Sequence, residues 1–315
     1  MSDAMTITRP MGVIPGMSFE SYLAVDAASS HALIDMRGSA ALCRWNKDNP
    51  VQESPDMFIG TACHDCILSP ETFPCRYIVG GDCEAILKSG PNKGLICGKS
   101  GKESRDGRWY CLAHSQAFAD DEIDEIPANA AIITLKEHDQ ITSAADAVNR
   151  HPTIREMLDL SPPEDRELSV FWIDGETGVY CKARFDALAR GLKIIHDLKS
   201  SRSAHKDFWM REAKSRGYDM QGAWYLEAAK AVGLDIDRFK AIPFEKKGPY
   251  CVNWAHFDPE ILKLAARANR ACLRKYAECL ASGNWPGYDE NGFIVKANQW
   301  DEIRVNELEA SNVCG

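Results

Sequence analysis

The chain has 315 residues, 45% of them hydrophobic, which is enough to bury a full core in one large domain or two ordinary ones. Its formal net charge of -9 argues mildly against a nucleic-acid partner, although metal-binding acids add to that charge and local basic stretches can still line a groove. No window holds about 18 uninterrupted apolar residues and the N-terminus lacks the order of a signal peptide, so we expect a cytoplasmic protein without a membrane partner.

The N-terminal part is predicted to be helical after a flexible arm. Residues 1–17 carry two prolines and no apolar period. Over 18–50, serines precede apolar residues at helical spacing, with Ser29 or Ser30 as the N-cap and Pro50 after the stop. Arg37 and Arg44 in this stretch either belong to a solvated helix face or reach a DNA phosphate.

A further helix is predicted over 54–69, with Ser54 as its N-cap and Pro55 at its first position. It carries Gly60 and His64, four residues apart. A single histidine on a helix is more often a packed or surface residue than a ligand. The nearby Cys63 and Cys66 lack the strand-to-helix context of a redox motif, so we interpret them as small buried residues.

Between residues 80 and 115 the composition changes to Gly, Lys and Ser, with few core-forming residues. Twelve cysteines in a chain expected in the cytosol favour metal ligands and buried thiols over disulfides. We predict one zinc ion bound by Cys83, Cys97, Cys111 and His114, with Cys75 in reserve, because such an ion would supply the missing folding energy. The alternative is a flexible loop with scattered free cysteines.

Residues 116–127 are predicted to be an acidic linker, followed by two amphipathic helices over 133–152 and 153–159. Beyond Pro163 the apolar residues recur at every second position, as in a strand. Stretches 167–173, 179–188 and 192–198 are predicted to form a three-stranded meander.

Asp186, Asp197 and Lys199 stand at the ends of the second and third of these strands. If the two strands are antiparallel neighbours, Asp186 and Asp197 lie opposite each other across the strand pair, with Cβ atoms about 5 Å apart. Two carboxylates this close can share hard divalent cations. Lys199, two residues beyond Asp197, points to the same face. This geometry is typical of a phosphodiesterase site; the alternative is a solvated strand end.

The rest of the chain is predicted to be helical and extended in turn. A long helical region over 203–233 is broken near Gly217, and it places Tyr218, Gln221 and Tyr225 on one face. Strands are expected over 238–245 and 249–257, and a last helix over 259–282. The tail from residue 283 has no strong period.

Four motifs in this order resemble the PD-(D/E)xK superfamily, within it the RecB and RecE-type exonucleases and most closely the phage and prophage exonuclease VIII group. They are Gly60-x-x-x-His64, Arg184-Phe185-Asp186, Asp197-Leu198-Lys199-Ser200 and Tyr218-x-x-Gln221-x-x-x-Tyr225. The chain departs from the pattern at Phe185, where proline is usual, at Ser200-Ser201, where two threonines are usual, and in the Cys-rich insert.

The resemblance implies an α/β fold with a restriction-endonuclease-like core: a helix, a three-stranded meander, a helix and a strand, forming a mixed central sheet flanked by helices. The expected divisions are a flexible arm over 1–17, a helical part of the nuclease over 18–79, a zinc-binding insert over 80–115, the nuclease core over 116–285 and a tail over 286–315.

The resemblance also implies a two-metal mechanism with Mg²⁺ or Mn²⁺. Asp186 would bridge both ions, Asp197 and the Leu198 carbonyl would hold the ion that carries the attacking water, and His64 would complete the other ion's coordination. Lys199 would orient that water. Gln221 and Tyr225 would hold the DNA strand or the acids, and Arg184, Ser200 and Tyr218 are expected to contact DNA.

The expected function is 5′ to 3′ exonuclease resection of linear duplex DNA in phage-type recombination inside a bacterial host cell. Expected partners are DNA ends, a homo-oligomeric ring of three or four copies and a single-strand annealing protein. The alternatives are a structure-specific endonuclease, a zinc-containing DNA-binding or assembly protein on a nuclease scaffold, and a regulatory module in which the insert recognises the partner.

Overall fold

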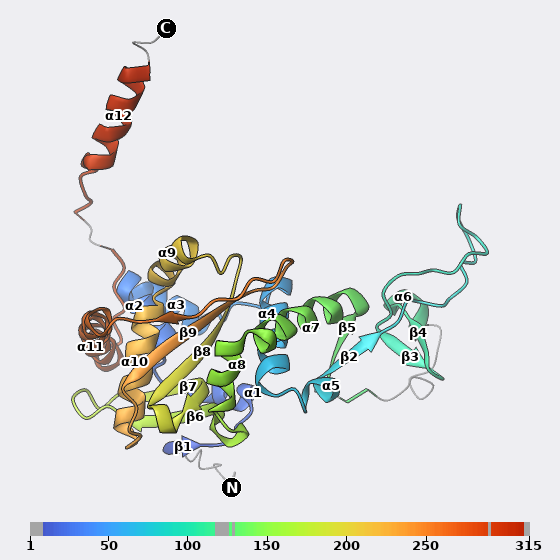
Figure 1. Cartoon of the computed structure of the whole chain (residues 1–315), viewed down its shortest axis with the longest axis horizontal. Coiled ribbons are helices and arrows are strands. Elements are labelled where there is room, and N and C mark those ends of the chain that lie inside the picture. The colour runs from blue at the N-terminus through green and yellow to red at the C-terminus, as the bar shows by residue number, and fades with distance from the viewer. Residues whose placement is uncertain (1–8, 117–125, 128–129, 289–290, 312–315) are drawn as a thin grey trace.

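The computed structural model describes residues 9–116, 126–127, 130–288 and 291–311. A mixed six-stranded sheet forms its centre, in the order β1-β6-β7-β8-β9-β10 (Figure 1). The strands of this sheet are β1 (Gly12–Ile14), β6 (Arg166–Ile173), β7 (Tyr180–Ala189), β8 (Ile194–Ser201), β9 (Arg238–Glu245) and β10 (Ala255–His256).

The predicted meander forms β6, β7 and β8, which pair antiparallel in sequence order. Strand β9 then pairs parallel to β8. A parallel neighbour needs a crossover connection, and two consecutive helices supply it: α9 (Lys206–Arg216) and α10 (Tyr218–Ala231). Gly217 separates them at φ +72°, a left-handed conformation that ends α9 where the sequence predicts the break.

Helices cover both faces of the sheet (Figure 1). One face packs against α10 and three further helices: α2 (Ser30–Gly38), α3 (Ala40–Asp48) and α11 (Pro259–Ser282). The other face packs against α4 (Pro55–Leu68), α7 (Leu135–Arg150) and α8 (Pro152–Asp159). The expected α/β fold, with a mixed central sheet between helices, is confirmed.

Several predicted helix limits agree with the structure because the predicted residues cap the helix ends. Ser29 caps α2 and Ser54 caps α4, each accepting a hydrogen bond from a first-turn backbone N–H, and Pro55 begins α4. Helix α3 ends at Asp48, ahead of Asn49 and Pro50. Helix α11 occupies the predicted range. The short helices α1 (Phe19–Ala24) and α5 (Phe73–Arg76) complete the N-terminal half.

Three local expectations are wrong. Residues Gly12–Ile14, expected within a flexible arm, form the edge strand β1 against β6. The expected strand over 249–257 is mostly irregular and pairs as β10 only at Ala255–His256. The tail contains a helix, α12 (Gln299–Ser311), that projects away from the body (Figure 1). No described residue of α12 is buried, so no packed apolar face signals it in the sequence.

The Cys-rich insert projects from the side of the molecule that carries α4 and α7 (Figure 1). Two parallel strands connect it to the body: β2 (Tyr77–Gly80) and β5 (Ala131–Thr134). It contains the hairpin of β3 (Glu103–Arg105) and β4 (Arg108–Tyr110), followed by α6 (Leu112–Ser115). The expected acidic linker falls mostly on residues 117–125, outside the described residues. Over the described part of the chain, no helix is long and apolar enough to cross a membrane.

Candidate functional site

The two aspartates lie where β7 and β8 separate. Pairing between these strands runs from Ala189 opposite Ile194 to Ala187 opposite His196, and the same register places Asp186 opposite Asp197. At this point the Asp186 side chain replaces the backbone hydrogen bonding between the two strands, because its Oδ2 accepts a 2.8 Å hydrogen bond from the Leu198 backbone N–H. The structure therefore places the two aspartates opposite each other on neighbouring strands, as the sequence predicts.

Lys199 forms an ion pair with Asp197, its neighbour two positions back on β8. The carboxylate of Asp197 is almost fully buried at 1% exposure, and the Lys199 side chain is 14% exposed. Burial alone would lower the pKa of Lys199, but the charges of Asp197 and Asp186 outweigh burial and raise it. The ammonium, 4.9 Å from the centroid of the Tyr218 ring, therefore keeps its proton at neutral pH.

Burial raises the pKa of both aspartates to about 6, from an ordinary value of 3.8. The positive charge of Lys199 opposes this rise at each carboxyl, and at Asp197 the charge of Asp186 adds to it. The single positive charge of Lys199 therefore neutralises the negative charge of the two buried carboxylates only in part. Such a surplus of negative charge fits a cation.

Helix α4 brings His64 to this pair. Its Nδ1 lies 3.7 Å from Oδ2 of Asp186, and its ring packs 5.8 Å from the Phe244 ring. Burial, followed by the charge of Lys199, lowers the pKa of His64 to about 4, so the imidazole is neutral at pH 7. A neutral imidazole is the form that binds metal ions.

Gly60 explains why α4 approaches β8 so closely. A Cβ at Gly60 would lie 2.9 Å from the Ser200 Oγ, which is closer than real Cβ contacts. Because residues four apart share a helix face, the close approach at Gly60 also directs His64 toward the sheet. This packing gives the Gly-x-x-x-His spacing a physical meaning.

Helix α10 contributes two buried polar side chains from the other face of the sheet. Gln221 Nε2 donates to the Tyr225 hydroxyl at 2.8 Å and lies 3.5 Å from Oδ1 of Asp197. Burial raises the pKa of Tyr225 well above its usual range, so the phenol keeps its proton. The neighbouring Gly222 lets α10 sit close to the sheet, since a Cβ there would lie 2.5 Å from the Phe239 ring.

The arrangement fits hard divalent cations, which take oxygen ligands. Over the described residues no hydrogen bond engages Oδ1 of Asp186, so this oxygen is available. The Leu198 N–H faces Asp186, and the N–H and C=O of one strand residue point to the same edge of the strand. The Leu198 carbonyl therefore faces the gap between β7 and β8, beside His64 and the two aspartates.

The residues predicted to contact DNA have varied surroundings. Arg184 is 12% exposed and donates to the Met17 carbonyl at 2.7 Å and to the Ser169 Oγ at 2.8 Å, so these internal bonds disfavour a DNA contact. Ser200 lies against Gly60, and Tyr218 lies beneath the Lys199 ammonium.

The two arginines of the N-terminal helices have local partners. Arg37 donates to the Ser215 carbonyl at 3.3 Å, whereas Arg44 pairs with Asp48 at 2.7 Å and lies 5.9 Å from the Trp285 ring centroid. These contacts agree better with the solvated-face alternative than with DNA contacts.

Sequence reasoning missed Glu167, which stands opposite Asp186 in the β6–β7 register. Its backbone has φ +49°, which is uncommon for a residue other than glycine. Its carboxylate accepts a 3.2 Å hydrogen bond from Ser69 and lies 3.4 Å from Arg184. After burial, its charge is among the influences that raise the pKa of Asp186. The register of the β6–β7 hairpin places it beside Asp186, and no sequence motif marks it.

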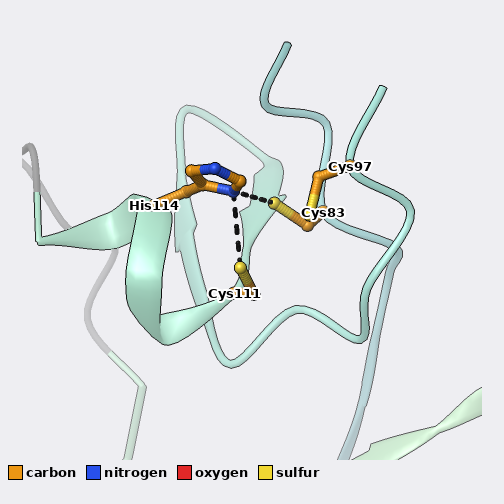
Figure 2. Close-up of side chains that lie close together, drawn as sticks. All are labelled: Cys83, Cys97, Cys111 and His114. Atoms are coloured by element: carbon orange, nitrogen blue, oxygen red, sulfur yellow. Dashed lines mark hydrogen bonds between the residues drawn. The ribbon is translucent and has the colours of Figure 1, made fainter. Parts of the chain in front are cut away.

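A second cluster lies in the insert, where Cys83, Cys97, Cys111 and His114 gather as predicted (Figure 2). Their ligand atoms all lie within 4.8 Å of one another. The His114 Nδ1 is 3.3 Å from the Cys83 sulfur and 3.4 Å from the Cys111 sulfur. Tetrahedral zinc with ordinary bond lengths separates a sulfur from a nitrogen by about 3.5 Å. The cluster therefore has the chemistry and spacing of a Cys₃His zinc site.

Local backbone structure presents these ligands. Gly98 adopts φ +62° directly after Cys97, which makes the tight turn that glycine permits. Cys111 caps the short helix α6, and the His114 N–H donates to its carbonyl at 2.8 Å. The side chain of Trp109 covers Gly81 and Gly101, where a Cβ would lie 2.7 Å from it. One indole and the Cys₃His cluster thus take the place of an apolar core in the insert.

Comparisons with known proteins agree with this geometry. Residues 29–298 match the sequence model of a family described as "PDDEXK-like domain of unknown function (DUF3799)". No curated protein matches. The fold is similar to the crystal structure of a "Putative exonuclease" from Eubacterium rectale, with a TM-score of 0.52 and 14% identity over 91% of this chain and 97% of that chain. At this identity the likeness concerns the fold alone.

Proposed function

The chain belongs to this family of PDDEXK-like domains, and on that premise we propose that it is a metal-dependent nuclease acting on linear double-stranded DNA. The observation that carries the proposal is the convergence of Asp186, Asp197 and Lys199 where β7 and β8 separate. Two carboxylates with incompletely compensated charge, next to an ammonium that keeps its proton, meet the needs of phosphodiester hydrolysis.

Asp186, Asp197, the Leu198 carbonyl and His64 would hold two divalent ions, Mg²⁺ or Mn²⁺. When bound, such ions activate a water and neutralise charge on the scissile phosphate and the leaving oxygen. Both aspartates must be ionised to bind cations, and His64 must be neutral. At neutral pH their pKa values of about 6 and about 4 satisfy both conditions.

Lys199 would orient the attacking water and stabilise negative charge as it develops. Its raised pKa favours this electrostatic role over that of a neutral base. Gln221 would hold Asp197 in place, and its bond to Tyr225 fixes the amide orientation. Their burial, 6% and 7% exposed, supports positioning of the acids more than direct contact with DNA.

We further propose exonuclease digestion from 5′ to 3′, in phage-type recombination, by a ring of three or four copies working with a single-strand annealing protein. This finer proposal rests on the resemblance of the four motifs, and the similar fold from Eubacterium rectale is named as an exonuclease. We also propose that the insert binds one structural zinc ion through Cys83, Cys97, Cys111 and His114.

The experiment that tests this function uses a linear duplex labelled at either its 5′ or its 3′ ends, incubated with the protein and magnesium. Digestion from 5′ to 3′ releases the 5′ label early as short products while the 3′ label stays on long strands. Early release of the 3′ label would reverse the polarity. Internal cuts on a closed circular duplex would favour an endonuclease.

A further inference from the structure

The insert contains a tongue of residues 83–99 that folds back on itself and projects beyond the hairpin of β3 and β4 (Figure 1). Backbone hydrogen bonds join its two arms. Leu87 N–H donates to the Leu95 carbonyl at 2.9 Å, and Cys97 N–H donates to the Ala85 carbonyl at 2.8 Å. An isolated bridge also pairs Ile86 with Ile96. The tongue is therefore a narrow two-stranded ribbon.

The charge of this region is opposite to that of the whole chain. Residues 85–102 contain four lysines and no aspartate or glutamate, in a chain whose net charge is -9. The four are Lys88, Lys93, Lys99 and Lys102, and all are exposed. Over the described residues none of the four forms an ion pair within 4 Å. Their charge is thus available to a partner.

The zinc-type cluster holds the base of this ribbon. Cys83 begins the tongue and Cys97 stands close to its end, and both belong to the Cys₃His cluster (Figure 2). Cys83 N–H also donates to the Lys99 carbonyl at 2.6 Å. A cross-link at the base keeps the two arms together, so the lysines project from a fixed support although the tongue has no apolar core.

We propose that the tongue binds the phosphate backbone of duplex DNA outside the active site and so holds the substrate for cleavage. This inference rests on the proposed nuclease function. Lysines bind phosphates as compact charges, and a two-stranded ribbon has the width that the major groove of DNA admits. An acidic body needs such a basic element to hold a polyanion. In the chain the insert follows α4, the helix that carries His64, through α5 and β2.

The exposed Ile86, Leu95 and Ile96, each more than 60% exposed, admit a second class of partner, an acidic protein surface. The lysines favour DNA, because Lys88, Lys93 and Lys99 recur along the tongue and Lys102 follows it, against the single acid Glu84 near its base. Binding measurements separate the two classes.

The test compares the wild-type protein with a variant in which Lys88, Lys93, Lys99 and Lys102 are all changed to glutamine. A matched control changes four exposed lysines of the body, Lys193, Lys230, Lys263 and Lys275, to glutamine. Binding to a fluorescent linear duplex is measured in calcium at several salt concentrations, and metal analysis verifies that each protein keeps its zinc. Cleavage is measured in magnesium at saturating DNA.

We expect the tongue variant to bind at least roughly tenfold more weakly, with a salt slope reduced by about 2 to 4, since each lost phosphate contact removes ~0.9 from it. Cleavage at saturating DNA stays within about twofold of wild type, because the tongue is remote from the reacting atoms. Unchanged affinity and slope, or an equal loss in the body control, would overturn the proposal and point to a protein partner. Absent cleavage by the wild type counts instead against the nuclease function, and the binding result stands independently.

Discussion

At the scale of single residues, replacing Lys199 tests the cleavage step separately from cation binding. It pairs with Asp197 without being able to bind a cation itself, so its removal leaves the carboxylates in place. We expect Lys199→Ala to lower magnesium-supported cleavage by roughly 10²-fold or more, in the range seen when one electrostatic donor is removed. Calcium-supported DNA binding should stay close to that of the wild type.

Lys240→Ala is a suitable control, since it removes one lysine from the neighbouring strand β9, where Lys240 lies 5.0 Å from the Trp254 ring centroid. It should cleave normally. If Lys199→Ala instead loses DNA binding and cleaves normally once bound, Lys199 is a DNA contact.

The raised pKa values of Asp186 and Asp197 predict how stability depends on pH. Between their ordinary value of 3.8 and about 6, the folded protein without divalent ions binds more protons at these groups than the unfolded chain does. Their contribution to stability is therefore present at low pH and is lost as pH rises through about 6. Magnesium needs the ionised forms, so the stabilisation it produces should grow over the same interval.

Melting temperatures with and without magnesium, from about pH 5 to about pH 7.5, check this sign. The magnesium-induced increase should be small at the low end and large at the high end, and Asp186→Asn should reduce it throughout. An increase of equal size at both ends would contradict the assignment of these carboxyls as ligands.

Individual residues differ in how far the sequence predicts them. Asp186, Asp197 and Lys199 follow from strand period and hairpin register alone, which depend on local geometry. Glu167 escapes prediction because an isolated acid at the start of a strand forms no motif, and its φ of +49° depends on the packed structure. The internal bonds of Arg184 depend on Met17 and Ser169, which are distant in sequence.

At the scale of elements, the contact between α4 and β8 positions His64. Gly60→Val should push the helix away from Ser200 and lower cleavage at least roughly tenfold, because branched side chains find no room beside an Oγ already 2.9 Å from the new Cβ. Gly60→Ala is the milder control, since the Ser200 hydroxyl can rotate away. Circular dichroism and cleavage rates of both variants decide the matter; normal cleavage by Gly60→Val would show that α4 does not set the geometry of the site.

The Cys₃His cluster of the insert predicts that the protein binds zinc, independently of the nuclease site. Purified protein should contain about one zinc per chain, and changing both Cys97 and Cys111 to serine should remove it, because two of four ligands are lost. Cys75→Ser provides the control, since Cys75 is exposed and lies outside the cluster. Elemental analysis measures all three proteins, and wild-type protein free of zinc would refute the site.

Elements were predictable where local signals decide them. The capped helices α2 and α4 and the break at Gly217 follow from serine, proline and glycine chemistry. The edge strand β1 and the parallel pair β2 and β5 depend on partners far along the chain, and short runs of three or four residues carry too little period to be read. Helix α12 buries nothing, so its sequence shows no apolar face.

At the scale of the whole molecule, the chain supplies a histidine on α4, then the basic insert, and then the acidic residues of β7 and β8. The four motifs are weak separately, and their order along the chain predicts the fold because the topology brings β7, β8, α4 and α10 together at one point. The insert could be predicted as a zinc module from its composition, whereas the ribbon shape of the tongue follows only from its backbone bonds.

The central claim is that Asp186 and Asp197 form a cation site for DNA cleavage. Its most direct test measures magnesium-dependent digestion of a linear duplex by the wild type, Asp186→Ala and Asp197→Ala, with circular dichroism to verify folding. We predict digestion by the wild type and less than a few percent of that rate for either folded variant, because each removes an oxygen ligand of the proposed ions. Wild-type rates in a folded variant would contradict the claim.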